Sequence, residues 1–186
     1  MTSSYQGRLL LGAPDLEDPN FFRSVVLLVD HSESGAIGVI LNRPTDTTLT
    51  RVWREVSDEP CLREAFLHAG GPCEGLLSAL HTDPDSAQVE VCEGVYFTAE
   101  APLLAQLVED SQRSIDARFF VGYAGWGPDQ LEMEVERGGW LLTPAAKQDV
   151  FTDAQTIWPR ILKRVSPSWA SMTFNPLIVP EDPSQN

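Results

Sequence analysis

The sequence predicts an α+β fold with a largely antiparallel, mixed β-sheet, free to curl, that is flanked by three to four helices. Runs of β-branched residues follow one another through short turns, which favours strands linked as hairpins. Apolar stripes at helical spacing interrupt these runs. The 186 residues include no linker long enough to divide them. We expect one domain over residues 1–165 and a divergent tail over residues 166–186, disordered at its end (residues 180–186).

The first strands are expected at residues 7–13, 24–30 and 36–41. The second and third of these runs are apolar on both faces, which is typical of central strands. Residues 31–35 form a polar loop between them, and a loop so short joins antiparallel strands in a hairpin. Pro44 cannot continue a strand ladder and is expected to end the third strand.

The first helix is predicted at residues 48–56, with Thr48 as its N-cap. Its apolar residues recur at the spacing of one helical face: Leu49, Val52, Trp53 and Val56. A second helix, at residues 100–112, has the same kind of stripe. Short apolar or aromatic runs predict further strands at residues 65–69, 76–80, 89–91, 94–98 and 118–123.

Residues 122–132 join the aromatic strand to a charged segment and contain three glycines and Trp126. Glycine there implies a sharply turned backbone or a close approach by another group. Residues 131–136 alternate apolar and acidic side chains, as a strand does. Pro128 before them and a pair of glycines after them nevertheless favour a short helix, followed by a strand at residues 140–143.

The last helix is expected over residues 153–165, where Pro159 either kinks the helix or marks its start. The basic cluster of Arg160, Lys163 and Arg164 is interpreted as the solvated end of this helix, because cations complement the helix dipole. A nucleic-acid-binding patch is the alternative. The net charge of −14 repels phosphate backbones, so we expect no direct binding of nucleic acid.

The composition indicates a cytoplasmic protein. The apolar runs are far shorter than the roughly 20 residues of a membrane span, and the first residues lack the pattern of a secretory signal. Cys61, Cys73 and Cys92 lack the spacing of a disulfide framework or a zinc site, and the histidines lack metal-ligand spacing. We therefore expect reduced thiols, no metal, no cofactor and no membrane association.

Asn42 and Arg43, at the end of the third strand, are the first candidate ligand-binding residues. An arginine can hold a carboxylate or phosphate through two parallel hydrogen bonds, and the asparagine amide adds a donor and an acceptor. The alternative is an internal salt bridge of Arg43 beside a turn that Pro44 closes.

Trp126 and Gln130 are the second candidate pair. Trp126 offers a flat apolar wall for a groove, and Gln130 offers a polar group. Backbone N–H groups left free near Pro128 could hold an anion. The alternative is that Trp126 belongs to the core, next to glycines that only permit close packing.

Cys73 points to a different class of function. An enzyme, either a hydrolase or a thiol-dependent one, would use Cys73 as its nucleophile with help from His68 or His81. A buried, inert thiol is the alternative. The preceding Gly-Gly-Pro sequence matches neither a phosphate-binding loop nor a dinucleotide fingerprint.

Several of these segments, by their order and spacing, resemble the YqgE/AlgH family over about residues 7–165. The resemblance implies a compact α+β domain of cytosolic bacterial proteins. Members are often described as candidate transcriptional regulators, and the family has no established molecular activity. The chain departs from the family pattern at Cys73, where a small aliphatic residue is usual, and in the tail after Ser166. The matching residues are 122–132 together with Pro14, Asp15, Leu16, Phe21, Ser24, Val25, Val26, His31, Gly35, Ala36, Ile37, Gly38, Asn42, Arg43, Pro44, Gly70, Gly71, Pro72, His81, Trp140 and Trp158.

Our leading hypothesis is a non-enzymatic domain that binds a small molecule or another protein, with an indirect regulatory role. Its site would combine Asn42, Arg43, Trp126 and Gln130. The enzyme that uses Cys73 or a histidine is the first alternative. A transcriptional regulator acting on DNA is the second, and the acidic charge and the missing helix-turn-helix pattern count against it.

Overall fold

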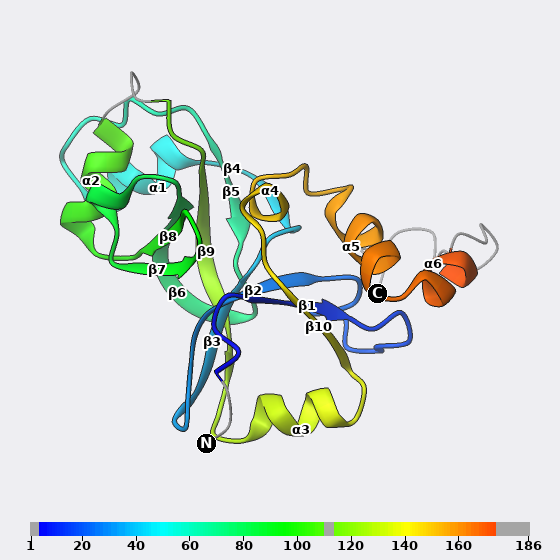
Figure 1. The fold of residues 1–186 in the computed structure, drawn as a ribbon. Coiled ribbons are helices and arrows are strands. Elements are labelled where there is room, and N and C mark those ends of the chain that lie inside the picture. Colours follow the sequence, from blue (N-terminus) through cyan, green and yellow to red (C-terminus); the bar gives the residue numbers. More distant parts are fainter. Residues whose placement is uncertain (1–3, 110–113, 174–186) are drawn as a thin grey trace.

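The computed structural model describes residues 4–109 and 114–173, and it confirms the α+β class and the mostly antiparallel sheet. The described strands form one curled sheet in the order β10-β1-β2-β3-β9-β6-β8-β7, with β4 paired to β5 and β5 paired to β9 (Figure 1). β5 and β9 run parallel, which makes the sheet mixed. The strands are β1 (Arg8–Gly12), β2 (Val25–Ser32), β3 (Gly35–Ile40), β4 (Pro44–Thr48), β5 (Phe66–Ala69), β6 (Cys73–His81), β7 (Val89–Cys92), β8 (Val95–Thr98), β9 (Ala117–Trp126) and β10 (Trp140–Pro144).

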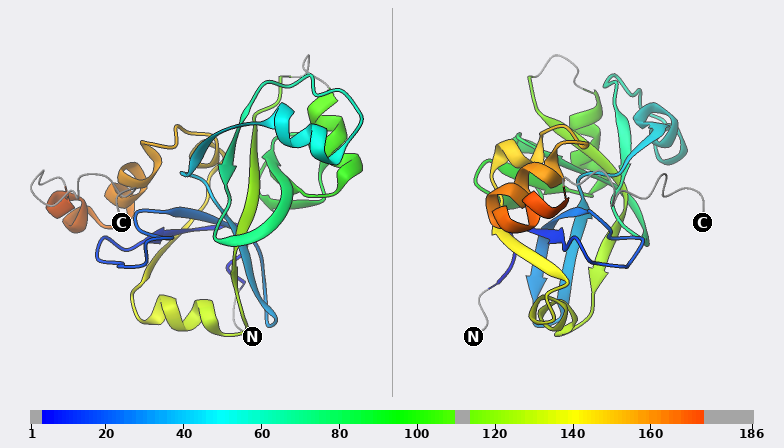
Figure 2. Two further views of the ribbon diagram at one scale, coloured as in Figure 1. Left: turned by 180° about the vertical axis from the view of Figure 1, so that it is seen from behind. Right: turned by 90° about the vertical axis from the view of Figure 1, so that its right-hand side faces the viewer.

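The helices gather in three places around this sheet (Figures 1 and 2). Four of them match the predicted helices, whereas α4 and α6 are additional. α4 is one turn long and shows no helical period, and α6 lies in the proline- and serine-rich tail. The helices are α1 (Leu49–Val56), α2 (Ala101–Glu109), α3 (Gln130–Glu136), α4 (Lys147–Val150), α5 (Ile157–Val165) and α6 (Pro167–Thr173), with a short 3₁₀ helix at Pro84–Ser86.

Each group of helices closes its own hydrophobic cluster. α5 and α6 cover one face of β1, β2 and β3, where Leu162 and Ala170 are buried. α3 covers the opposite face, and its Leu131 packs with Trp126 and Trp140 (Figure 2). α1 and α2 close a third cluster over β5, β6 and β9. Burial of these apolar faces is the main force that holds the helices on the sheet.

β9 is the strand that joins the parts of the sheet. Its first half lies between β5 and β6, and its last three residues pair with β3. The sequence predicted that this strand stops at residue 123 and that a turned junction follows. That prediction was wrong, because the strand continues to Trp126. Gly122 and Gly125 permit close packing within the strand, whereas Gly127 follows it and has no close neighbour.

Two glycine-rich segments make that close packing possible. A Cβ atom on Gly70 would overlap the carbonyl oxygen of Gly122, and a Cβ on Gly71 would overlap the backbone of Tyr123. Gly122 has φ +76°, a conformation that side chains disfavour. The turn before β6 therefore lies directly against the backbone of β9.

Three predicted boundaries need correction. Pro44 begins β4, at an edge where its missing N–H costs no ladder bond. The predicted loop at residues 31–35 is shorter, since β2 extends through Ser32. α5 begins at Ile157, so Pro159 lies in its first turn, where proline is tolerated. The predicted disorder of residues 180–186 concerns a segment outside the described residues, and the boundary at residue 165 stays a prediction.

Gly70→Ala is expected to destabilise the fold by about 3 kcal/mol, because the added methyl group meets rigid backbone rather than a movable side chain. Gly127→Ala is the matched control, since its Cβ would lie 3.8 Å from the Gln130 Oε1 atom, an ordinary contact. Urea unfolding followed by circular dichroism measures both. Equal stabilities of the two variants would contradict the packing argument.

Candidate functional site

A polar pocket of about 410 Å³ opens where the β2–β3 hairpin, the start of β6 and the end of β9 meet. Its lining residues bring one carboxylate, three hydroxyls and a thiol to it, and Trp126 also borders it. The lining residues are Asp30, Ser32, Ser34, Gly35, Ala36, Ile37, Cys73, Tyr123, Gly125 and Trp126. Among the described residues that line it, none carries a positive charge.

An apolar pocket of about 380 Å³ adjoins it, and the two share Ile37 and Tyr123. Leu76 stands on its rim with 80% of its surface exposed, an unusual state for a leucine in a strand. The remaining lining residues are Val39, Gly75, Ser78, Phe97, Ala99 and Gly122. We call the two pockets together the groove.

Strand register explains where the polar pocket opens. Asp30 of β2 pairs with Ile37 of β3, which pairs with Gly125 of β9, so the three form one row across the sheet. Gly125 leaves a gap in this row because it has no side chain. A Cβ there would lie 3.0 Å from the Tyr123 ring and 3.7 Å from the Cys73 sulfur. The glycine thus keeps the pocket open.

Trp126 forms part of the pocket wall and also belongs to the core under α3, with 6% of its surface exposed. The Glu134 Oε2 atom accepts hydrogen bonds from the indole N–H groups of Trp126 (3.0 Å) and Trp140 (2.8 Å). Phe21 stacks on Trp126, with ring centroids 6.0 Å apart. One carboxylate therefore fixes the Trp126 indole under α3, while Ile37 and Gly125 of the neighbouring pair face the pocket.

Gln130 lies on the same side of the fold, where it caps the end of β9. Its side chain accepts a hydrogen bond from the Gly127 N–H and donates one to Glu134, both 3.0 Å long. Gln130 does not line the groove. Both polar groups of its amide have partners within the chain, and ligand contact by Gln130 stays a prediction.

Asn42 and Arg43 lie at the opposite end of β3. The Asn42 amide accepts from the Val25 N–H (2.9 Å) and donates to the Arg23 carbonyl (2.8 Å). Arg43 donates to the carbonyls of Asn42 and Phe22, and burial lowers its pKa. No carboxylate ion-pairs with Arg43 among the described residues, so the salt bridge that the sequence left open is not observed there.

The two predicted halves of the site are therefore apart. Trp126 pairs with Ala36, six residues before Asn42, which corresponds to about 20 Å along a strand. Neither Asn42 nor Arg43 lines the groove. They connect to it indirectly, because they hold the loop from which Phe21 reaches Trp126. Whether Asn42 and Arg43 contact a ligand stays a prediction.

Cys73 lines the polar pocket and is a half-buried free thiol. Its predicted helpers are elsewhere. His81 is fully buried at the other end of β6, eight residues and about 25 Å along the strand. His68 lies in β5, packed against Phe120. Burial lowers the pKa of both histidines to about 4, with Arg118 adding to the effect at His68.

His31 is fixed in a separate cluster beside α3. Its Nδ1 atom accepts from the Tyr5 N–H (3.0 Å), so Nε2 carries the proton and donates to Glu132 (2.8 Å). The Tyr5 ring stacks on the imidazole. Like the other two histidines, His31 does not line either described pocket.

Asp30, Ile37 and Leu76 line the groove, and sequence reasoning named none of them as site residues. Ile37 lies in a run that is apolar on both faces, so the pattern indicated burial, yet 42% of its surface is exposed. Leu76 lies where β6 departs from its regular pairing with β9, between Cys73 and Leu77. An apolar residue that is exposed because the strand pairing is irregular can mark a binding site, but only the structure shows where this happens.

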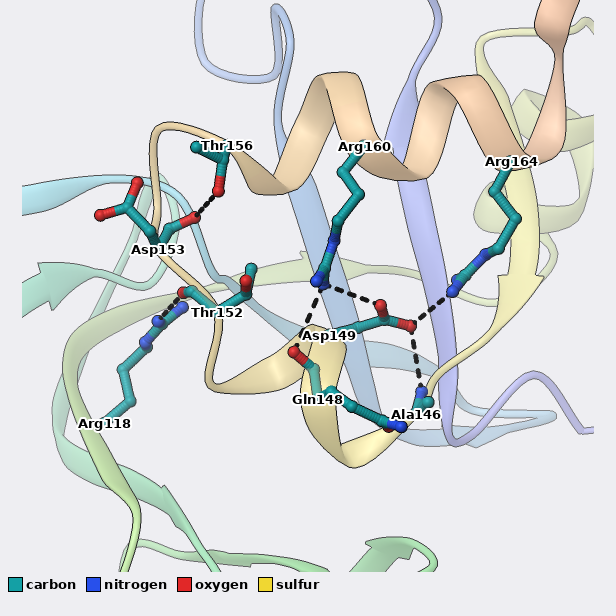
Figure 3. A network of polar contacts seen from close by, with 9 residues as sticks. All are labelled: Arg118, Ala146, Gln148, Asp149, Thr152, Asp153, Thr156, Arg160 and Arg164. Atoms are coloured by element: carbon teal, nitrogen blue, oxygen red, sulfur yellow. Dashed lines mark hydrogen bonds and ion pairs between the residues drawn. The ribbon is translucent and has the colours of Figure 1, made fainter.

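The basic cluster on α5 has a specific structural role. Arg160 and Arg164 both bind the buried carboxylate of Asp149, each at 2.9 Å, and this ties α5 to α4 (Figure 3). Arg118 reaches from β9 to the carbonyls of Leu41 and Thr152. The contacts of Arg160 and Arg164 give the predicted solvated helix end a structural function, and the absence of nucleic-acid binding stays a prediction.

Residues 4–109 and 114–173 contain neither a candidate membrane-spanning helix nor a candidate metal site. No helix there combines the length and hydropathy needed to span a membrane. No three histidine, cysteine, aspartate or glutamate side chains gather there as a metal site would require. The expectations of no metal and no cofactor stay predictions.

Comparisons with known proteins agree on one family. The AlgH-like family pattern matches residues 9–170. A UPF0301 protein of Chlorobaculum tepidum is 37% identical over 88% of this chain and 90% of its own length, and one of Thermobifida fusca is 36% identical over 98% and 96%. The solution structure of the AlgH protein from Pseudomonas aeruginosa is 25% identical, covers 98% of both chains and has a TM-score of 0.75. The crystal structure of a Corynebacterium diphtheriae protein is 27% identical over 92% of both, with a TM-score of 0.69.

Glu134→Ala is expected to lower the free energy of unfolding by about 2 kcal/mol, because two buried indole N–H groups lose their acceptor. Glu134→Gln keeps one acceptor oxygen and should cost less. Glu136→Ala, an exposed position on the same helix, is the control. Unfolding followed by tryptophan fluorescence tests the series, and a Glu134→Ala variant as stable as the control would disprove the role.

His81 is expected to make the fold less stable in acid. Its pKa is about 4 in the folded chain and about 6.5 in the unfolded chain, so the unfolded state binds the proton first. This contribution is complete above pH 6.5, falls between pH 6.5 and 4, and is constant below. The loss at pH 4.5 is on the order of 2 kcal/mol.

The measurement is urea unfolding at pH 7 and pH 4.5 for the wild type and for His81→Asn, which can still accept the Asp83 N–H bond. His68 and the acidic residues other than Asp83, whose charge acts on His81, affect both proteins alike. The wild type should therefore lose more stability than the variant, and equal losses would show that His81 protonates freely in the folded state.

Proposed function

The chain belongs to the AlgH-like family, as its motifs predicted, and we propose that it is a non-enzymatic cytoplasmic domain that binds a small molecule or a segment of another protein in the groove. One observation carries the proposal. A polar and an apolar pocket adjoin on the sheet surface and share Ile37 and Tyr123. A ligand with a polar part and an apolar part would contact both.

The frame of the groove supports this function. Most of its lining residues belong to β3, β6 and β9, and the glycine contacts between the turn before β6 and the backbone of β9 fix the spacing of β6 and β9. Trp126, which lines the polar pocket, is held in place because Glu134 and Phe21 fix its indole under α3. A rigid wall reduces the conformational entropy that binding must overcome.

The predicted site residues take different roles in this proposal. Trp126 contacts the ligand directly. Gln130 acts through Glu134, which it helps to orient, and Asn42 and Arg43 act through the loop that carries Phe21. A ligand bound in the groove would therefore depend on these three residues without touching them.

A thiol-dependent enzyme is the second candidate, since Cys73 lines the polar pocket. A nucleophilic thiol needs a base or a cation beside it to form the thiolate at neutral pH. The described lining of the pocket holds neither a histidine nor a lysine or arginine. The hydroxyls and the Asp30 carboxylate suit hydrogen bonding to a ligand better than activation of a thiol.

Any regulatory role of this domain would be indirect in our proposal. The net charge of −14 disfavours contact with DNA. Arg160 and Arg164, which could have formed a basic patch, share the Asp149 carboxylate. A regulatory effect would then pass through whatever occupies the groove.

NMR titration with a panel of uncharged aromatic amides tests the groove. Amide shifts should cluster at Ile37, Leu76 and Tyr123. Replacing both exposed apolar residues (Ile37→Ser with Leu76→Ser) should weaken binding about 10-fold, because roughly 1.4 kcal/mol of apolar contact is lost.

Val56→Ser is the matched control, because Val56 is 59% exposed on α1 and lies outside both pockets. The control should bind as the wild type does. Shifts that cluster elsewhere, or equal affinities of the double variant and the control, would refute the groove as the binding site.

A further inference from the structure

We propose that the occupant of the groove is an extended polypeptide segment that places a lysine or arginine at the polar pocket and large apolar side chains at the apolar pocket. This inference rests on the proposed binding function and specifies the partner. The partner is a segment of another protein that carries this combination of a basic residue and apolar residues.

Carboxylates at and near the polar pocket that have no partner among the described residues define the charge that the ligand should carry. Asp30 lines the pocket, Glu33 lies between two of its lining serines, and Glu74 lies between Cys73 of the polar pocket and the apolar pocket. All three are exposed and make no hydrogen bond or ion pair with any residue that the structure describes. Other acids, such as Glu134 and Asp149, bind groups of the chain itself.

No described lysine, arginine or histidine lines either pocket. A cationic side chain in the polar pocket would therefore meet the Asp30 carboxylate of the lining, with Glu33 and Glu74 exposed next to lining residues in the sequence, in a chain that is already strongly acidic. An anionic ligand would meet repulsion. Charge complementarity selects a basic group for this end of the groove.

The apolar pocket defines the other half of the ligand. Its rim exposes Leu76 and Ile37, and only Ser78 and the shared Tyr123 bring side-chain hydroxyls to it. Alternate side chains of an extended segment point the same way and are spaced by about 7 Å. Because the two pockets share a wall, neighbouring same-side residues of one segment can enter both.

The shape of the groove favours a polypeptide over a small molecule. Both pockets are open hollows on a sheet surface, whereas small-molecule sites bury most of the ligand in an enclosed cavity. Anionic membrane surfaces would be repelled by the carboxylates. A second copy of this chain brings the same excess negative charge. Residues 174–186 contain two acids and no lysine or arginine, so the tail lacks the required charge.

Selection from a phage-displayed library of random heptapeptides tests the inference. Peptides retained by the full-length protein should be enriched in lysine or arginine beside apolar residues at alternating positions, and depleted in acidic residues. The affinities of selected peptides are then measured by fluorescence anisotropy, and they should fall as salt concentration rises, since the carboxylates are exposed.

A triple variant probes the carboxylates: Asp30→Asn, Glu33→Gln and Glu74→Gln. Selected peptides should bind it about 10-fold more weakly, the effect of a few exposed ion pairs together. The control removes the same charge from exposed positions near α1: Asp58→Asn, Glu55→Gln and Glu64→Gln. It should change affinity by less than about 2-fold.

The outcomes separate this inference from the proposed function. If uncharged amides bind the groove but selected peptides carry no basic residues, or bind both triple variants equally, the inference is wrong and the groove function stands. If neither amides nor peptides bind there, both are wrong. Concentration-dependent dimers that Leu76→Ser disrupts would also overturn it, by assigning the groove to a second copy.

Discussion

The close contact between two backbones, at Gly70 and Gly71 on one side and Gly122 and Tyr123 on the other, is the constraint on which the rest of this structure depends. β9 can pair with β5 and β6 in its first half and with β3 in its second half because nothing larger than hydrogen separates it from the turn before β6. The same contact sets the distance between Cys73 and Tyr123, which are paired on neighbouring strands and both line the polar pocket. The same backbone contact therefore shapes both the strand pairing and the groove.

Acidic residues in this chain fall into two groups: some bond to other groups of the fold, and others are exposed around the groove. Glu132, Glu134 and Asp149 accept hydrogen bonds from His31, from two tryptophans and from two arginines, and each of these contacts fixes a helix to the sheet or to another helix. The carboxylates around the groove make no such contacts within the described residues. Because a buried carboxylate needs partners and an exposed one does not, burial decides which acids hold the fold and which remain available to a ligand.

Much of the fold could be predicted from local patterns, and the site largely could not. Apolar runs located most strands, and the stripe from Leu49 to Val56 located α1 with its Thr48 cap. The three glycines of residues 122–127 were recognised as a place of close approach, but the pattern could not show that only Gly122 meets the backbone of Gly70 and Gly71. Asn42 and Arg43 were noticed as polar residues at a strand end, and their actual partners are carbonyls that are distant in sequence.

The sequence by itself determined the family, the α+β class, the acidic charge and the glycine-rich segments, since each is a matter of composition, order or local period. Only the tertiary structure decided that Ile37 and Leu76 are exposed, that Asp30 aligns with Gly125, and that Trp126 and Arg43 lie at opposite ends of β3. The physical reason is register. A strand's pattern gives its two faces, but which residues meet across the sheet depends on pairing between distant segments. At the groove, the paired residues Ala36 and Trp126 are ninety positions apart.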